Sequence, residues 1–264
     1  MEILSEIIAI TKKDFKLSIR FKTAYLLNTF INPFLSVIPL FIIYYGFLHY
    51  TGSEGFGGVT ADNYVQFLIF GIIAQAFFYN GTYIFALKFR EEKYWKTIDA
   101  LFVAPINYLS LIIGTGINVG LNLLPLFLVF LLFASVFGAP SILMITLTVL
   151  IMFILLGFCL GAGLIYGALT LFNENFDPFF RYFFAAWILL SCFAYPLNII
   201  PEVFRGIVLI NPVFHAVNFA REMWMHNFIA WGSFFYVLGF AIIMPIISVF
   251  VFKLAWKRME VQGY

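Results

Sequence analysis

The chain has 264 residues, of which 63% are hydrophobic and 11% are charged, and its formal net charge is +2. Soluble domains carry about 25% charged residues, and several charge-free runs here exceed the roughly 20 apolar residues that cross a bilayer. This composition excludes a soluble globule, and the near-neutral charge implies no nucleic-acid partner. We expect an all-α polytopic membrane protein with a single transmembrane domain over residues 1–264.

Residues 1–22 combine apolar and charged side chains at helical spacing. At about 100° per residue, Ile3 and Ile7 fall on an apolar face, while Glu6 and Lys13 fall on a polar one. A helix with such segregated faces lies in the membrane interface. We predict an amphipathic interfacial helix with its lysines toward lipid headgroups. A simple topology signal is the alternative, and the two readings are compatible.

Six apolar segments are predicted to cross the membrane. Spans one and two lie in residues 23–87 (23–50 and 63–87), spans three to five in residues 106–198 (106–137, 141–172 and 179–198), and span six is 232–254. Basic residues gather before the first span, between the second and third, and at the end of the sixth, and positive residues favour the cytoplasm. Both termini, including the tail 255–264, are therefore expected to be cytoplasmic.

Residues 88–105 form the most densely charged segment, with seven ionised side chains in the twelve residues from Lys88 to Asp99. A membrane protein concentrates charge where a loop must lie in water and meet a partner. The chain has no GxxxxGK[ST] motif, so it does not bind ATP through a P-loop. Energy for uphill transport would have to arrive through another polypeptide. We predict a cytosolic helix that docks it, with a solvated charged loop as the alternative.

Residues 199–231 are apolar but interrupted every few residues, for example by Pro201, Glu202, Pro212 and Arg221. A seventh crossing here would place the basic C-terminal tail outside the cell, against the distribution of positive charge. We predict short extracellular re-entrant helices that dip into the outer leaflet and return, where protein or water covers the backbone.

Glycines recur at four-residue spacing inside the predicted spans, as at Gly116 and Gly120 or Gly157 and Gly161. Small residues at this spacing allow helix backbones to approach closely. They predict a packed helix bundle and carry no functional assignment.

The spans offer little chemistry. They hold essentially no ionisable residue in mid-span, which disfavours an ion-coupled transporter. The only acidic pair near an inner interface, Glu174 and Asp177, has too few carboxylates for a magnesium–diphosphate cluster. We read it as starting the next helix and offsetting Arg181. We expect no catalytic, metal or cofactor site. The alternative from another class is an integral membrane enzyme acting on isoprenoid lipids.

The charged segment resembles the cytosolic coupling region of ABC type-2 permeases, the membrane subunits of one class of ABC exporters. That family shows a pattern like R-E-x-x-x-G-T-L-E-x-L-x-x-x-P. Here the residues are Arg90 and Glu91, then Lys96, Thr97, Ile98 and Asp99, and later Leu101 and Pro105. Lys96 replaces the family's glycine and adds a charge where relatives have a flexible joint.

Residues 195–224 are similar to the same family's region between the fifth and sixth spans, which has two separated prolines, an Asn-Pro pair and a later arginine. The matching residues are Pro196, Pro201, Asn211, Pro212 and Arg221. In relatives this region forms short re-entrant helices near the outer exit. The resemblance therefore implies that these five residues belong to an outer gate.

The resemblance implies a half-transporter in the cell membrane: two copies of the chain pair, and two ABC ATPase subunits, which bind ATP and Mg²⁺, dock beneath them. The implied motor-coupling residues are Arg90, Glu91, Glu92, Tyr94, Trp95, Thr97, Ile98 and Asp99. The aromatic residues and Ile98 would anchor the contact, and the charged ones would set its register.

The N-terminal part looks more like the drug- and lipid-exporting branch of that family than the polysaccharide-exporting one, because a basic RYxxxxLG-like stretch is missing. The 21% of aromatic residues suits lipid contact and an interfacial belt. We expect an exporter permease that moves an amphipathic or hydrophobic cargo outward by alternating access. The alternative within the same fold is a lipid-linked polysaccharide exporter.

Overall fold

The computed structural model describes residues 2–31, 35, 38–39, 42, 59, 63–95, 106–137 and 141–262. Its elements are α1 (Glu2–Ile19), α2 (Lys22–Leu26), the π-helix η1 (Leu27–Ile31), α4 (Tyr64–Tyr79), the π-helix η2 (Asn80–Ile84), α5 (Phe85–Tyr94), α7 (Tyr108–Phe137), α8 (Ile142–Phe172), α9 (Phe176–Leu189), the 3₁₀ turn η3 (Leu197–Ile199), α10 (Glu202–Ile210), α11 (Pro212–His226) and α12 (Trp231–Gln262). Within these residues there is no strand, which confirms the all-α prediction.

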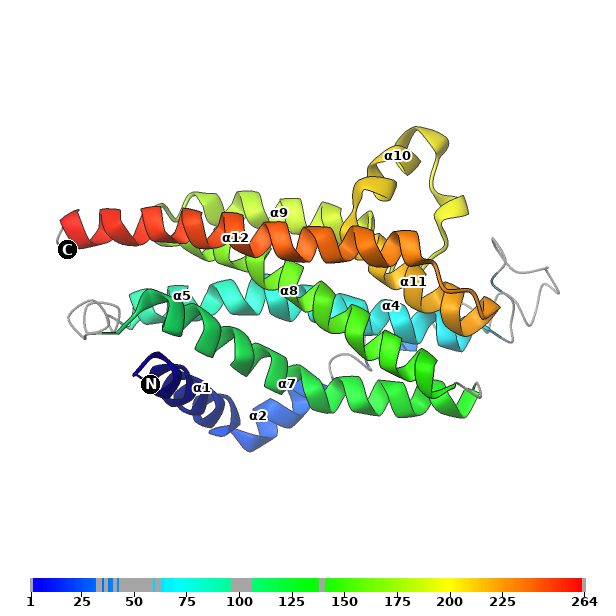
Figure 1. Cartoon of the computed structure of the whole chain (residues 1–264), viewed down its shortest axis with the longest axis horizontal. Helices are drawn as coiled ribbons and strands as arrows, with labels where there is room; N and C mark the ends of the chain where they lie inside the picture. Colours follow the sequence, from blue (N-terminus) through cyan, green and yellow to red (C-terminus); the bar gives the residue numbers. More distant parts are fainter. Residues whose placement is uncertain are drawn as a thin grey trace.

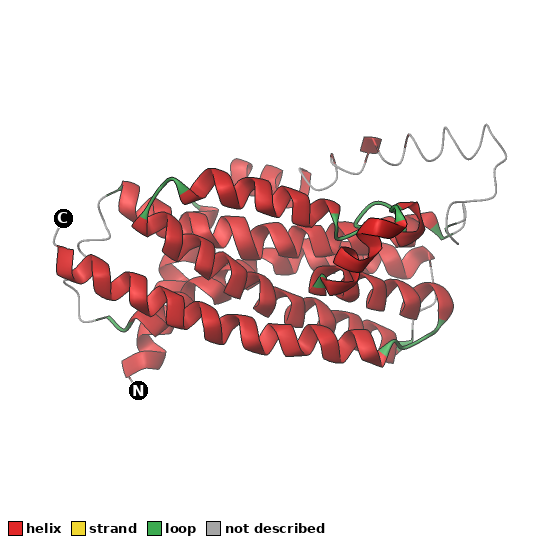
Figure 2. Ribbon diagram, turned by 90° about the horizontal axis from the view of Figure 1, so that it is seen from above, coloured by secondary structure: helices red, strands yellow, loops and turns green. Residues whose placement is uncertain are grey.

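The long helices run along one axis of an elongated bundle (Figures 1 and 2). Helix α1 begins and α12 ends at the same end of this axis, where α5 also ends (Figure 1). We call this the termini end. Helices α10 and α11, the end of α7 and the start of α8 lie toward the opposite, far end.

Among the described residues, four helices are long and apolar enough to cross a membrane: Tyr64–Tyr94, Tyr108–Leu132, Ile142–Phe172 and Trp231–Lys257. They coincide with the predicted second, third, fourth and sixth spans, so the chain is a membrane-embedded helical protein. The first of them continues to Tyr94, past its predicted end at residue 87. Most of the predicted first span, 23–50, lies outside the described residues.

The predicted fifth span differs most from the structure. Helix α9 has 14 residues, or about 21 Å at 1.5 Å per residue, whereas a bilayer core is about 30 Å thick. The helix ends at Leu189 rather than at 198 because Cys192 takes a left-handed conformation, with φ of 53°, and Pro196 follows. One continuous helix over 179–198 was therefore wrong, and the six-span count stays a prediction.

Residues 199–231 contain α10 and α11, which meet at a bend of 92°. Asn211 forms the bend: its Oδ1 accepts a hydrogen bond from the Val213 amide at 2.9 Å, and Pro212 occupies the first turn of α11. Helix α11 packs against α4, α8 and α12. Helix α10 instead exposes Val203 and Phe204.

Some of the glycines at four-residue spacing allow the close helix contacts that this spacing predicted, and these contacts involve α8. A Cβ on Gly163 would lie 2.3 Å from the carbonyl oxygen of Gly81 in η2, and one on Gly161 would lie 2.9 Å from the backbone of Met244 in α12. Gly116 and Gly120 on α7 differ, because a Cβ there would meet only leucine side chains at 3.4 and 3.5 Å. Those two glycines leave space instead of closing it.

Candidate functional site

The first part of the predicted coupling segment is the end of a long helix. Residues 88–94 are the last part of α5, which continues α4 and η2 without a break. Tyr94 and Trp95, at the tip of this long helix, are 83% and 71% exposed. Their rings meet edge to face, with centroids 5.8 Å apart. Thr97, Ile98 and Asp99 lie outside the described residues. The helix therefore ends in a pair of exposed aromatic side chains.

Just behind that tip, three side chains from three helices surround the carboxylate of Asp177. Asp177 lies in the first turn of α9 and is buried. Its Oδ1 accepts hydrogen bonds from the Arg90 guanidinium of α5 and, at 2.5 Å, from the Tyr166 hydroxyl of α8. Its Oδ2 accepts one from Arg181 at 2.6 Å. We call these four residues the Asp177 cluster.

Electrostatics keep the centre of the cluster ionised. Burial by itself would raise the pKa of Asp177, but hydrogen bonds from Tyr166 and Arg181 and the nearby Arg90 charge hold it below its ordinary value of 3.8. Its place in the first turn of α9 also favours a negative charge, because a helix N-terminus is positive. The carboxylate can therefore hold two cationic helix segments together at neutral pH.

Further ion pairs tie the end of α5 to its neighbours. Lys93 donates to the Leu171 carbonyl at 3.2 Å and lies 3.3 Å from Glu174, both near the turn between α8 and α9. Glu92 pairs with Lys13 of α1 at 2.8 Å. The end of α5 is thus fastened to α1 on one side and to the start of α9 on the other.

These contacts divide the predicted motor-coupling residues into two groups. Arg90 and Glu92 are engaged by this chain's own side chains. Glu91 is 56% exposed, and within the described residues its one ion pair is with Lys88 of the same helix, at 3.7 Å. Glu91, Tyr94 and Trp95 therefore form an outward-facing group, which we call the α5 tip.

The far end of the bundle holds a second buried charge. Arg221 of α11 is 6% exposed, and its guanidinium donates to three backbone carbonyls: Phe67 at 3.1 Å, Cys192 at 2.8 Å and Phe193 at 2.6 Å. It also lies 3.4 Å from the centroid of the Phe67 ring. Within the described residues no carboxylate pairs with it, so carbonyl dipoles and a ring face compensate its charge.

The turn after α9 is shaped to receive Arg221. Gly71 of α4 lets this turn approach, because a Cβ there would lie 1.8 Å from the Phe193 carbonyl oxygen. Asn211 Nδ2 donates to the Ser191 hydroxyl at 2.9 Å and to the Leu190 carbonyl at 3.3 Å. Arg221 and Asn211 therefore clamp the residues where the predicted fifth span breaks.

The five predicted outer-gate residues lie in different parts of the far end and do not form one cluster. Arg221 and Pro196 line a polar cavity of about 470 Å³, together with Glu222, His215 and His226. Asn211 and Pro212 form the bend between α10 and α11, and Pro201 precedes α10. In the part of the chain that the structure describes, no three His, Cys, Asp or Glu side chains gather as a metal site would require.

Sequence reasoning missed part of both sites. The Asp177–Arg181 pair follows from i,i+4 spacing and is confirmed at 2.6 Å. The Asp177 contacts with Arg90 and Tyr166 join three helices, and no local pattern indicates them. The partners of Arg221 are backbone carbonyls, which leave no trace in residue identity.

Comparison with known proteins gives two findings. Residues 5–225 match the model of a family described as "ABC-2 type transporter". Over 236 residues the chain is 22% identical to "Inner membrane transport permease YadH" of Escherichia coli strain K12, which covers 88% of each chain. Proteins of the same name from Escherichia coli O157:H7 and Shigella flexneri match to the same extent.

Proposed function

The chain belongs to the ABC-2 type transporter family, and from that premise we propose that it is the membrane permease subunit of an ATP-driven exporter in the cell membrane. Two copies pair, and an ABC ATPase that binds ATP and Mg²⁺ docks on each at the termini end. The cargo is amphipathic or hydrophobic, drug-like or lipid-like, and moves outward by alternating access.

The observation that carries this proposal is the α5 tip. Exposed aromatic side chains beside an exposed charge are typical of an interaction surface, because aromatic residues anchor interfaces and a charged rim sets their register. In a chain without a P-loop, a docked ATPase accounts for such a surface at the end of a spanning helix.

The proposed orientation rests on charge. The lysines of α1, the charged end of α5 and Lys253 and Lys257 of α12 lie at the termini end, and positive residues favour the cytoplasm. The bent pair α10–α11 then lies on the outer side. We propose that it forms re-entrant helices at the outer gate, with Arg221 holding the turn that follows α9.

The Asp177 cluster supplies a path for movement between the two ends. A displacement of the α5 tip by the ATPase would reach α9 through Arg90 and Asp177, and α9 leads directly to the turn that Arg221 holds. We propose that the docked motor shifts α9 in this way and thereby opens the outer gate.

The test is co-purification of the chain with a candidate ABC ATPase. We expect Trp95→Ala and Glu91→Lys to weaken ATPase binding about tenfold or more, because both remove exposed interface side chains. Tyr182→Ala is the matched control, since Tyr182 is an equally exposed aromatic residue on α9 outside the tip. Glu92→Gln breaks the ion pair with Lys13 inside this chain. This variant therefore shows what loss of an internal contact does to ATPase binding, separately from loss of an exposed interface side chain.

A contrary result is equally clear. A chain that purifies alone, and whose activity ignores ATP hydrolysis, contradicts the exporter. Inside-out vesicles that contain both subunits test the cargo class: ATP-dependent uptake of a hydrophobic dye supports the proposal, and uptake of a lipid-linked glycan alone supports the polysaccharide-exporter alternative. The match to a transporter family argues against the membrane-enzyme alternative.

A further inference from the structure

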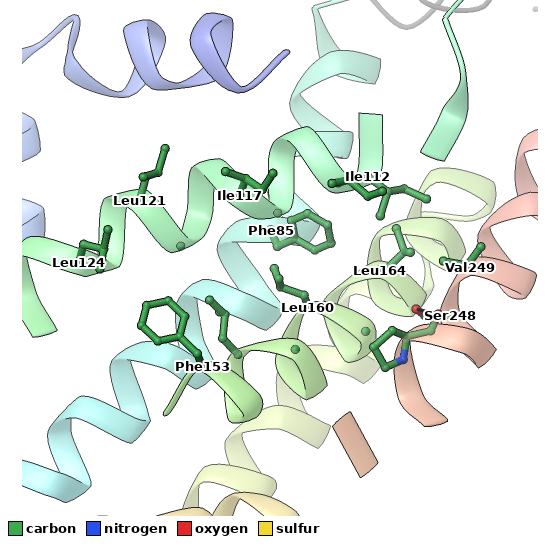
Figure 3. Close-up of a pocket in the computed structure, with 17 residues that line it drawn as sticks. Phe85, Ile112, Ile117, Leu121, Leu124, Phe153, Leu160, Leu164, Ser248 and Val249 are labelled. Atoms are coloured by element: carbon green, nitrogen blue, oxygen red, sulfur yellow. Dashed lines mark hydrogen bonds between the residues drawn. The ribbon is translucent and has the colours of Figure 1, made fainter. Parts of the chain in front are cut away.

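A groove with an almost wholly apolar lining runs between α7, α8 and α12, with Phe85 of α5 at its floor. Its volume is about 530 Å³. In Figure 3, Ile117 and Leu121 of α7 lie across the space from Leu160 and Phe153 of α8. The lining residues lie in the first half of α7 and around the middle of α8 and α12, so the groove extends from the middle of the bundle toward the termini end.

The sequence explains why this space is not filled by side chains. Gly116 and Gly120 on α7 and Gly157 on α8 are lining residues, and each removes a side chain that would otherwise project between the helices. On the α7 rim, Ile113 and Ile117 are each 45% exposed. The groove therefore opens sideways, toward the surroundings of the bundle, through apolar side chains.

The chain is embedded in a membrane, so lipid molecules surround the bundle and reach this opening. Side chains from one face of a helix in a second copy are the other occupant that an open groove of about 530 Å³ admits, and the oligomeric state tests for it. A flexible hydrocarbon chain fits a narrow apolar space of this kind and gains dispersion contacts along its length.

Two lysines mark the end of the groove. Lys88 follows the lining residue Phe85 by three residues on α5, and Lys253 follows the lining residue Val249 by four residues on α12, so each lies one turn beyond the lining on its helix. The Phe89 and Phe252 rings, with centroids 5.3 Å apart, hold these two helix ends together. Positive charge therefore lies one helical turn beyond the apolar lining, on the side of the termini end.

We propose that this groove binds an acyl chain of an anionic phospholipid from the leaflet at the termini end, with Lys88 and Lys253 contacting its headgroup phosphate. The site needs only the membrane-embedded bundle and is independent of cargo and of ATP. The bound acyl chain fills the space between α7 and α12 in which the glycines provide no side-chain contacts.

The test measures phospholipid retention by the full-length chain purified in mild detergent, by native mass spectrometry during titration with phosphatidylglycerol or phosphatidylcholine. Gly120→Leu fills the groove, and its Cβ meets Leu156 only at an ordinary 3.5 Å. We expect it to abolish saturable retention of both lipids. The matched control is Gly239→Leu on α12, because a Cβ at Gly239 meets no atom within 4 Å and Gly239 does not line the groove.

The headgroup contact has its own variant. Lys88→Gln combined with Lys253→Gln is expected to weaken phosphatidylglycerol retention about tenfold, since a lysine near an anionic lipid is worth roughly a factor of five and Lys88 is shared with Glu91. Phosphatidylcholine retention should change little. Lys12→Gln, which removes an exposed charge on α1, is the control.

Two results would overturn the proposal. The first is a Gly120→Leu variant that folds, as judged by its elution in size exclusion, and still retains both lipids like the unaltered chain. The second is a change in oligomeric state on Gly120→Leu with unchanged lipid retention, which would make the groove a contact between copies. Neither result tests ATPase docking, so a failure of the lipid proposal would leave the proposed function unaffected, and the reverse also holds.

Discussion

Each end of the bundle holds a buried charge, and the two charges are compensated by different kinds of groups. At the termini end, Asp177 is surrounded by two arginines and a hydroxyl from three helices. At the far end, Arg221 contacts only carbonyl oxygens and a ring face among the described residues. One charge is balanced by opposite charges that remain partly exposed, and the other by dipoles inside the protein.

This difference implies different mechanical properties. Arg90 and Arg181 have side chains that are 30% and 55% exposed, so water can replace part of each contact when helices move. The Arg221 contacts are buried, and breaking them leaves a cation and three carbonyls unpaired where water is scarce. We expect the Asp177 cluster to rearrange readily and the Arg221 site to act as a rigid clamp.

The largest expected effect is at Arg221. Arg221→Met should destabilise the chain by about 3 kcal/mol or more, because the carbonyls of the turn after α9 lose charge-assisted hydrogen bonds. Arg221→Lys should recover only part of this, since a single ammonium cannot reproduce the guanidinium fork. Thermal unfolding in detergent measures both variants. A lysine variant as stable as the unaltered chain would contradict the clamp.

Gly71→Ala tests the same clamp from the opposite helix. The added Cβ would lie 1.8 Å from the Phe193 carbonyl oxygen and 2.8 Å from Arg221 Nη2, so the turn must shift, at a cost of about 1–3 kcal/mol. Gly206→Ala on α10 is the control, because nothing lies within 4 Å of its Cβ. Equal melting temperatures for the two variants would show that the turn adapts freely.

At the termini end, Asp177→Asn should cost about 1–2 kcal/mol, because it leaves Arg90 and Arg181 without their shared anion. Arg90→Gln should cost more than Arg181→Gln, because the Arg90 side chain is less exposed and links two helices, whereas Arg181 contacts its own helix. Thermal unfolding of the three variants gives the order. The reverse order for the two arginines would refute the assignment of Arg90 as the link between α5 and α9.

The smallest effect concerns pH. The pKa of Asp177 is lower in the folded chain than its ordinary value of 3.8, so its contribution to stability is complete above that value and is lost as the pH falls through the folded pKa. The Asp177 cluster should therefore add no pH dependence between about pH 5 and 8. A difference between the unaltered chain and Asp177→Asn that shrinks as the pH is lowered from 8 to 5 would contradict this sign.

Much of the fold could be predicted because the membrane imposes simple rules. Apolar length located the helices at 64–94, 108–132, 142–172 and 231–257. The prediction failed at α9, since hydropathy cannot distinguish a spanning helix from a shorter one followed by a buried turn. That turn depends on Cys192 adopting a positive φ and on the space left by Gly71, which lies far earlier in the chain, on α4.

The sequence likewise predicted only part of the candidate site. The charged residues before Tyr94 were predicted to form a docking segment, which stays a prediction. The sequence did not indicate which way each of these side chains points, because a helix presents charged side chains on every side. Packing decided that Arg90 and Glu92 face this chain while Glu91 and the aromatic residues do not. The motif that suggested an outer gate included Arg221 without indicating what it binds.

The sequence by itself determined the class of protein, since the free energy of transferring long apolar runs into a bilayer outweighs other local preferences, and it marked where charge meets water. Only the tertiary structure decided which charges are neutralised within the chain and which remain for a partner. Those contacts join helices far apart in sequence, and their free energies depend on distances and burial that exist only after the helices have packed.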